Sequence, residues 1–223
     1  MWVIILAGGY GSRMQTDIPK QFLEMCSKPI LIHTIMAFVD ACEGVQLVIV
    51  ICPSQRKRWQ ELCRIHNFTI PHQIAEGGLT RFQSVKNGLS FIPDEYKGLV
   101  AIHDGVRPLV SRHTINNCFS EAAKYGCAVP VVPVVDSVRE VSGQTSRVLS
   151  RSSLRLIQTP QVFDICLIKK AYNQEYITSF TDCASVFESA GNKIHLTNGS
   201  VDNIKITTSH DMVLAEALFK SQK

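Results

Sequence analysis

The sequence lacks any apolar stretch approaching the roughly 20 residues that are needed to span a lipid bilayer. Its first apolar run, residues 2–7, ends at Gly8 and Gly9, and no basic leader precedes it. We therefore expect neither a signal peptide nor a membrane anchor. Excess charge is also small, because 23 Lys and Arg against 19 Asp and Glu give a net charge of +4. Without basic runs interleaved with aromatic residues, the sequence predicts no nucleic-acid binding.

Cysteine pairs at the spacing of zinc ligands are also missing, although the chain has 8 cysteines. Several lie within apolar runs, as Cys52 does behind residues 48–51, where a thiol packs as a small apolar side chain. Disulfides persist mainly in oxidising compartments. The pattern therefore predicts reduced core cysteines and a cytoplasmic protein.

What the sequence does have is a regular alternation of β-branched runs and amphipathic stretches over 223 residues, of which 45% are hydrophobic. The expected strands are residues 3–6, 45–52, 69–75, 99–103 and 128–132, and the expected helices are residues 29–42, 54–66, a helix from Thr80 and one over 111–126. Asp164, Thr181 and Ser209 are candidate caps of later helices, and short strands are expected near Ile194 and Ile204. This order predicts a Rossmann-like α/β fold, with a mainly parallel sheet, helices on both faces and ligands bound at the carboxyl ends of the strands.

One segment departs from the alternation. Residues 136–151 place Val138, Val141 and Val148 around a polar turn at 142–146, which predicts a protruding β-hairpin arm. An isolated hairpin is marginally stable, so we expect the arm to pack against something. No linker or composition shift appears, so the sequence predicts a single domain over residues 1–223.

The strongest chemical signal is a glycine-rich loop directly after the first strand. Gly8, Gly9 and Gly11 carry no Cβ, so backbone N–H groups can approach a phosphate chain closely, and Arg13 and Lys20 add positive charge. The loop matches neither a Walker A motif nor a dinucleotide fingerprint. The alternative is a glycine-rich turn with solvated basic residues.

A second glycine pair, Gly77 and Gly78, again follows a strand and precedes a helix. Unpaired N–H groups at a helix start favour an anionic or carbonyl-rich ligand. Considered alone, the segment is better explained by an ordinary turn capped by Thr80, with Gln83 completing a capping box, but two such glycine loops together favour a nucleotide pocket.

A third group of polar residues lies at the end of the strand over 99–103. Asp104 is suited to sugar hydroxyls or Mg²⁺, and Arg107 to a phosphate, although the two could simply form an ion pair. His103 is interpreted as a packing residue. Lys205 lies between Ile204 and Ile206, so it either faces the pocket or is an edge-strand charge.

The whole chain resembles the 2-C-methyl-D-erythritol 4-phosphate cytidylyltransferases. The resemblance rests on an ordered set of motifs: AGGYGSRM at residues 7–14, PKQ at 19–21, Gly77-Gly78 with Arg81 and Ser84, HDGVRP at 103–108, QTPQ at 158–161, Thr181-Asp182 and NIK at 203–205. Single motifs of this kind occur in other nucleotidyltransferases, but their combination is specific.

The resemblance implies CMP transfer from CTP to 2-C-methyl-D-erythritol 4-phosphate, with release of pyrophosphate, in non-mevalonate isoprenoid synthesis, and Mg²⁺ held mainly by the CTP phosphates. The implied catalytic residues are Arg13, Lys20, Arg151 and Lys205; the nucleotide-binding residues are Ala7, Gly8, Gly9, Gly11, Gly78 and Ser84; the substrate-binding residues are Asp104, Arg107, Ser137 and Thr181. It also implies a homodimer in which the arm brings Arg151 to the partner's site.

Three positions differ from the usual family pattern. The family more often has two alanines before the first glycine, whereas here Ala7 is the only one. The single alanine also occurs in ribitol-5-phosphate cytidylyltransferases, so CMP transfer to ribitol 5-phosphate stays an alternative. Ser137 replaces a threonine of the arm, and Cys183 stands where relatives often carry an acidic residue. A non-catalytic nucleotide-binding module is the alternative from another class, and the presence of all four catalytic cations argues against it.

Overall fold

The computed structural model describes residues 1–9 and 18–221. The sequence-based expectations for Gly11 and Arg13 therefore fall outside the described residues.

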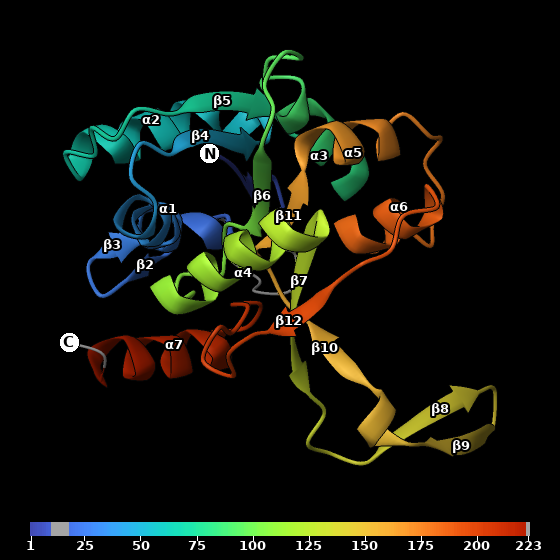
Figure 1. The fold of residues 1–223 in the computed structure, drawn as a ribbon. Coiled ribbons are helices and arrows are strands. Elements are labelled where there is room, and N and C mark those ends of the chain that lie inside the picture. Colours follow the sequence, from blue (N-terminus) through green and yellow to red (C-terminus); the bar gives the residue numbers. More distant parts are fainter. Residues whose placement is uncertain (10–17, 222–223) are drawn as a thin grey trace.

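One 8-stranded sheet organises the molecule (Figure 1). Its strands follow the order β10-β7-β11-β6-β1-β4-β5, and β12 also pairs with β7. The bounds are β1 Trp2–Ala7, β4 Gln46–Ile51, β5 Gln73–Glu76, β6 Leu99–Asp104, β7 Cys127–Pro133, β10 Arg155–Ile157, β11 Gln161–Asp164 and β12 Leu196–Asn198. Strands β6, β1, β4 and β5 run parallel, whereas β11 runs antiparallel to both β6 and β7.

Helices cover both faces of this sheet, because β1 is apolar on both sides. Val3 and Ile5 pack toward α1 (Ile30–Ala41), α2 (Arg56–Ile65) and α4 (Arg112–Tyr125). Ile4 lies in the opposite core with α3 (Arg81–Leu89), α5 (Ile165–Ala171) and α6 (Cys183–Ser189). Burial of both faces is typical of parallel strands. The expected Rossmann-like α/β fold is confirmed.

A smaller apolar cluster lies beside the sheet. The short pair β2 (Glu24–Met25) and β3 (Lys28–Pro29) contributes Met25, and α7 (Ser209–Ser221) contributes Ala215. Ile206 joins the same cluster, and its backbone N–H donates to the carbonyl of Val106. This contact fixes the chain beside Lys205, one residue before Ile206.

Local chemistry sets the helix ends. Ser111 caps α4, and Gly126 ends it at φ +80°, a left-handed conformation that favours glycine. Asp164 caps α5 as expected, but the cap of α6 is Asp182 and not Thr181. Asp182 takes this position because its carboxylate accepts from Ser185 N while the Ser185 hydroxyl accepts from Asp182 N.

Two other expectations about the last third of the chain are wrong. Residues near Ile204 form no strand in the described chain, because their backbone bonds locally and to Val106. Helix α7 begins at Ser209 itself, and the hydroxyl of Thr208 accepts from Asp211 N. The strand expected near Ile194 is present as β12.

The arm is the hairpin β8 (Val138–Ser142) and β9 (Thr145–Leu149), which pair with each other. Gly143 takes φ +57° in the tight turn between them. Figure 1 shows the hairpin projecting from the far end of β7, well away from the helices. The short 3-10 turn η4 (Arg151–Ser153) leads from the arm into β10.

All eight cysteines are free thiols. Within residues 1–9 and 18–221, the helices are too short or too polar to cross a membrane.

Candidate active site

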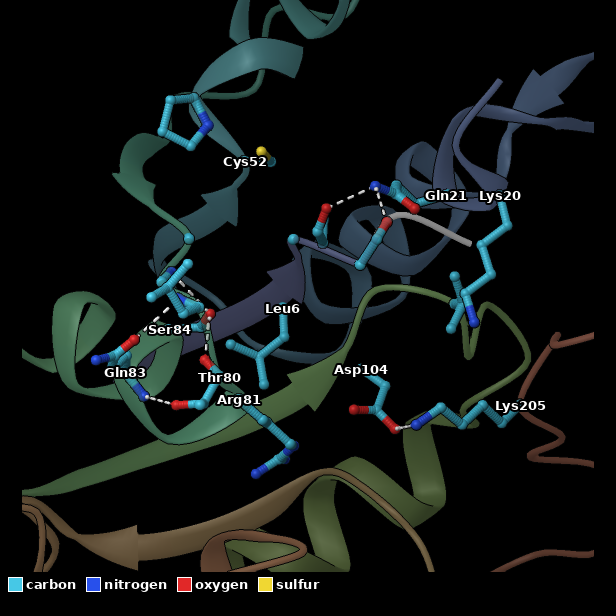
Figure 2. A pocket seen from close by; sticks show the side chains of 18 residues that line it. Leu6, Lys20, Gln21, Cys52, Thr80, Arg81, Gln83, Ser84, Asp104 and Lys205 are labelled. Carbon is cyan, nitrogen blue, oxygen red and sulfur yellow. Dashed lines mark hydrogen bonds and ion pairs between the residues drawn. The ribbon is translucent and has the colours of Figure 1, made fainter. Parts of the chain in front are cut away.

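A cavity of about 790 Å³ opens at the carboxyl ends of β1, β4 and β5. Its walls come from segments far apart in the sequence: the turn after β1, Lys20, the loop before α3, Asp104 at the end of β6, and Lys205 (Figure 2). The edge is the one expected for ligand binding in a parallel sheet.

Gln21 holds the first glycine turn. Its buried amide Nε2 donates to the carbonyl of Ala7 at 2.7 Å and to Gln55 Oε1 at 3.0 Å, and lies 3.2 Å from the Gly9 carbonyl. Gln21 thus holds the backbone of this turn in place, and Gly8 and Gly9 line the cavity. Beyond its chain neighbours, a Cβ on Gly9 would meet no atom of the described residues within 4 Å, so those residues leave room for a ligand there.

The second glycine loop is held by Ser84 and Gln83. Ser84 Oγ accepts from Gly78 N at 3.0 Å and donates to the Thr80 carbonyl at 2.9 Å. Thr80 caps α3 as expected, but Gln83 Oε1 accepts from Leu79 N at 2.9 Å and does not close a capping box with Thr80. A Cβ on Gly78 would lie 2.4 Å from the Cβ of Gln83, so this position requires glycine.

Asp104 is the centre of a compact charge cluster. Its Oδ2 lies 3.0 Å from Lys205 Nζ and 3.3 Å from Arg107 Nε. Burial alone would raise the pKa of Asp104, but the charges of Lys205, Arg81 and Arg107 together lower it well below its usual range. The ion-pair and ligand-site interpretations of Asp104 and Arg107 are thus compatible, because the pair itself lines a cavity.

Behind this cluster, a buried hydrogen-bond chain fixes the turn after β6. Asp104 N donates to Thr159 Oγ1, and the hydroxyl of Thr159 lies 3.1 Å from His103 Nδ1. His103 Nε2 lies 3.1 Å from the carbonyl of Arg107, which only accepts, so Nε2 carries the proton. Burial lowers the pKa of His103 to about 4, which keeps the ring neutral. His103 is buried as the packing interpretation predicted, and its hydrogen bonds also make it a positioning residue.

A second cavity, of about 390 Å³, adjoins the first. Arg107, Thr159, Thr181 and Asp182 contribute to its walls. Three charged residues line both cavities: Arg81, Asp104 and Lys205. The second cavity therefore meets the first at a charged boundary.

Most of the residues expected at the site come together. Ala7, Gly8, Gly9, Gly78, Ser84, Lys20, Asp104 and Lys205 line the larger cavity, and Arg107 and Thr181 line the smaller one. Lys205 extends toward Asp104, so the pocket-facing alternative is the one observed (Figure 2). The cavity walls do not include Ser137 or Arg151, which are exposed at the base of the arm. Arg151 donates to the carbonyl of Val135.

Three residues of the described site were not singled out as site residues from the sequence. Gln21 lies in the PKQ motif and Thr159 in the QTPQ motif, so the resemblance contained a signal for both. Arg81 lies in the Gly77-Gly78 motif, which assigns it no role. Its side chain bonds Cys183, 102 positions away, and no local pattern reveals that contact.

Comparisons with known proteins agree with this geometry. The model of the 2-C-methyl-D-erythritol 4-phosphate cytidylyltransferase family matches residues 1–221. The enzyme of that name from Phocaeicola vulgatus is 47% identical over 216 residues, covering 97% of this chain and 98% of the relative. The one from Bacteroides thetaiotaomicron is 45% identical with the same coverage.

Solved structures show the same fold. The cytidylyltransferase of Francisella tularensis superposes with a TM-score of 0.81 at 30% identity, covering 97% of this chain and 98% of that one. The 4-diphosphocytidyl-2C-methyl-D-erythritol synthase of Anaerococcus prevotii gives 0.82 at 25% identity, covering 98% and 97%. These relatives do not favour the ribitol-phosphate or the non-catalytic alternative. The chain belongs to the 2-C-methyl-D-erythritol 4-phosphate cytidylyltransferase family.

Proposed function

We propose that this protein transfers CMP from CTP to 2-C-methyl-D-erythritol 4-phosphate and releases pyrophosphate, as a step of non-mevalonate isoprenoid synthesis. The observation that carries the proposal is the pair of adjoining cavities, which share Asp104 and Lys205, in a chain whose family match runs from residue 1 to 221. The larger cavity is assigned to CTP and the smaller one to the acceptor.

The reaction needs little acid–base chemistry. A phosphate monoester has a second pKa near 6, so the acceptor is mostly a dianion at neutral pH and attacks without a general base. A neutral, buried His103 is consistent with that. The barrier is electrostatic, because a dianion must approach the α-phosphorus of an anionic triphosphate while pyrophosphate leaves in line.

Positive charge at the boundary of the cavities lowers this barrier. Lys20 and the backbone of Gly8, Gly9 and Gly11 are assigned to the triphosphate, together with Arg13. Lys205 is assigned to the α-phosphate, and its contact with Asp104 holds it ready at the boundary. The Gly78 N–H is already paired with Ser84, so this loop is assigned to shaping the nucleotide cavity.

The acceptor is assigned to Arg107, Thr181 and Asp104 in the smaller cavity. Arg107 also donates to the carbonyl of Asn203 at 2.7 Å, so its guanidinium is fixed before substrate arrives. The hydroxyl of Ser137 and the guanidinium of Arg151 complete the acceptor site from the arm of a second subunit.

Mg²⁺ is the proposed cofactor, and the donor set suits a metal that arrives with the nucleotide. Among the described residues that line the larger cavity, Asp104 is the acidic one, and two cations already bind its carboxylate. Triphosphate oxygens would therefore be the main ligands. When bound, Mg²⁺ neutralises part of the phosphate charge.

The arm supports a homodimer. Val141 and Val148 share one face of the hairpin, and both are about 70% exposed, at 71% and 68%. The neighbouring Leu156 and Ile157 are also exposed. Apolar surface of this kind marks an interaction site. We assign residues 1–223 to one nucleotidyltransferase domain, with the arm lying over its partner, and its free thiols suit the cytoplasm.

The test is a pyrophosphate-release assay with Mg²⁺. It compares CTP, UTP and ATP, each with 2-C-methyl-D-erythritol 4-phosphate and with ribitol 5-phosphate. We expect the highest kcat/KM for CTP with the methylerythritol phosphate. A preference for ribitol 5-phosphate would reassign the substrate, and the absence of pyrophosphate with every pair would reject the enzymatic function.

A further inference from the structure

Arg81 occupies an unusual position between the two cavities. It is the first residue of α3, and its side chain runs from the glycine loop toward the side of the pocket where Asp104 and Lys205 lie (Figure 2). It lines both the nucleotide cavity and the acceptor cavity. Its guanidinium is therefore located where the two substrates must meet.

The hydrogen-bond partner of this guanidinium is a thiol. Arg81 Nη1 lies 3.1 Å from Cys183 Sγ, and Tyr172 Oη donates to the same sulfur at 3.2 Å. Cys183 is fully buried, and burial raises the pKa of its thiol. The sulfur therefore accepts two hydrogen bonds as a neutral group and holds Arg81 in place without cancelling its charge.

The charges of Arg81 and Asp104 act on each other, but the two side chains form no direct ion pair. Within residues 1–9 and 18–221, no Asp or Glu oxygen forms an ion pair with Arg81. Asp104 is bound directly by Lys205 and Arg107. Arg81, Lys205 and Arg107 thus surround one carboxylate, that of Asp104.

Two further acidic residues line the smaller cavity: the Asp182 carboxylate already accepts from Gln161 Nε2 and Ser185 N, and Glu188 is exposed. The three cations around Asp104 therefore favour a phosphate dianion beside them.

The location of Cys183 indicates which substrate meets this charge. Its neighbours Thr181, Asp182, Ala184 and Ser185 line the acceptor cavity. The bond to Cys183 therefore holds the guanidinium toward that side, whereas the glycine turns and Lys20 lie in the nucleotide cavity.

We propose that Arg81 is a further binding residue for the phosphate of the acceptor, held by the uncharged thiol of Cys183 so that its full positive charge is available to the substrate. The identity of the acceptor rests on the proposed function. The anion-binding role of Arg81 does not, because it follows from the charges and contacts of the site.

A matched pair of variants at Cys183 isolates the charge. Asp and Asn have nearly the same shape, so Cys183→Asp places a carboxylate against Arg81 while Cys183→Asn leaves it charged and hydrogen-bonded. We expect the Asp variant to have a KM for the methylerythritol phosphate about tenfold above that of the Asn variant, the loss of about one charge-assisted contact. We expect the KM for CTP to differ by less than about threefold between the two, since the nucleotide contacts are unchanged.

Binding of inorganic phosphate to the free protein, measured by calorimetry, provides a readout independent of turnover. It should be weaker in Cys183→Asp than in Cys183→Asn. If the wild-type protein released no pyrophosphate, the proposed function would fail while this comparison still decided the role of Arg81. Equal phosphate affinities and equal acceptor KM values in the two folded variants would overturn the proposal.

A second pair covers the case in which either change at Cys183 prevents folding. Arg81→Lys keeps the charge and Arg81→Gln removes it, at similar length. A purely structural role predicts equal effects of these two variants. Our proposal predicts that Lys restores most of the phosphate affinity that Gln loses, and failure of that rescue would overturn it.

Discussion

The pocket edge of the sheet and the arm differ in how their side chains are held. At the pocket edge, each functional group is fixed within the same chain: Gln21 holds the first glycine turn, Ser84 holds the second, and Thr159 with His103 holds Asp104. In the arm, β8 and β9 bond to each other and expose Val141 and Val148. The pocket is preorganised, whereas the arm presents a surface that its own chain leaves uncovered.

The two regions also differ in the contacts that stabilise them. The carboxyl end of β6 is supported by a buried hydrogen-bond network and by the cores on both faces of the sheet. A two-stranded hairpin is marginal by itself in water. The arm should therefore contribute little to the stability of the body and gain its own from a second subunit.

Deleting the arm should have the largest effect. Val138 and Leu149 face each other in the hairpin, so two glycines can replace residues 138–149. We expect the shortened protein to elute as a monomer, to unfold cooperatively on heating and to have activity at background level. Gel filtration, circular dichroism and the pyrophosphate assay measure the three properties. A shortened chain that is unfolded at 25 °C would show that the arm is part of the body's core.

Removing one cation from the pocket should have the next largest effect. Lys20→Ala is expected to lower kcat by about a hundredfold, a typical loss for one group that stabilises charge in a transition state. The midpoint of thermal unfolding should change little. Lys86→Ala, at an exposed position of α3 outside both cavities, is the matched control and should retain wild-type turnover. Near-wild-type kcat in Lys20→Ala would refute the role of Lys20.

A methyl group in the glycine turn should have a smaller and more selective effect. Beyond its chain neighbours, no atom of residues 1–9 and 18–221 lies within 4 Å of a Cβ placed on Gly9, so we expect Gly9→Ala to leave the urea midpoint unchanged. The methyl group would keep a phosphate from close approach, raising the KM for CTP by about tenfold through loss of one contact. The acceptor KM is the internal control. If both KM values stayed at wild-type level, the CTP phosphates would not contact the backbone at Gly9.

Lowering the pH should reduce the free energy of unfolding, because His103 is buried in its neutral form. Its pKa falls from 6.5 to about 4 on folding because the ring is buried, so between these pH values the unfolded chain binds a proton that the folded chain does not. The free energy of unfolding is therefore at its full value above pH 6.5 and falls as the pH drops toward 4, by up to about 3 kcal/mol.

Urea titrations of the wild-type protein at pH 7 and pH 5 measure this loss, and His103→Gln should show a shallower pH dependence. His113→Gln, at an exposed position of α4, provides the control and should keep the wild-type slope. An unchanged slope in His103→Gln would contradict the assignment of acid sensitivity to this residue.

The sequence was sufficient to predict the sheet, because the residues of β1 and β4 are apolar on both faces and recur with helical segments between them. It also predicted that Gly8, Gly9, Lys20 and Asp104 share one edge, since loops after parallel strands meet there. The arm was predicted from Val138, Val141 and Val148 around the polar turn at 142–146, a pattern that differs from the continuous apolar runs of the buried strands.

Other features depend on contacts that the sequence does not show. Thr181 and Asp182 are both good caps, and the reciprocal bond with Ser185 decides between them. Ile204 and Ile206 alternate with polar residues as in a strand. The backbone there instead bonds to the carbonyl of Val106 and does not pair with an edge of the sheet. The bond between Arg81 and Cys183 joins segments whose spacing carries no signal.

We propose that the pocket is built within one chain and completed by the arm of another. Mixing Arg151→Ala subunits with Lys205→Ala subunits tests it directly, after subunit exchange is confirmed by mass. Both homodimers should be inactive, whereas each heterodimer would contain one intact site, so random pairing in a symmetric dimer should restore about a quarter of wild-type activity. No recovery in the exchanged mixture would place Arg151 in its own chain's site and contradict the claim.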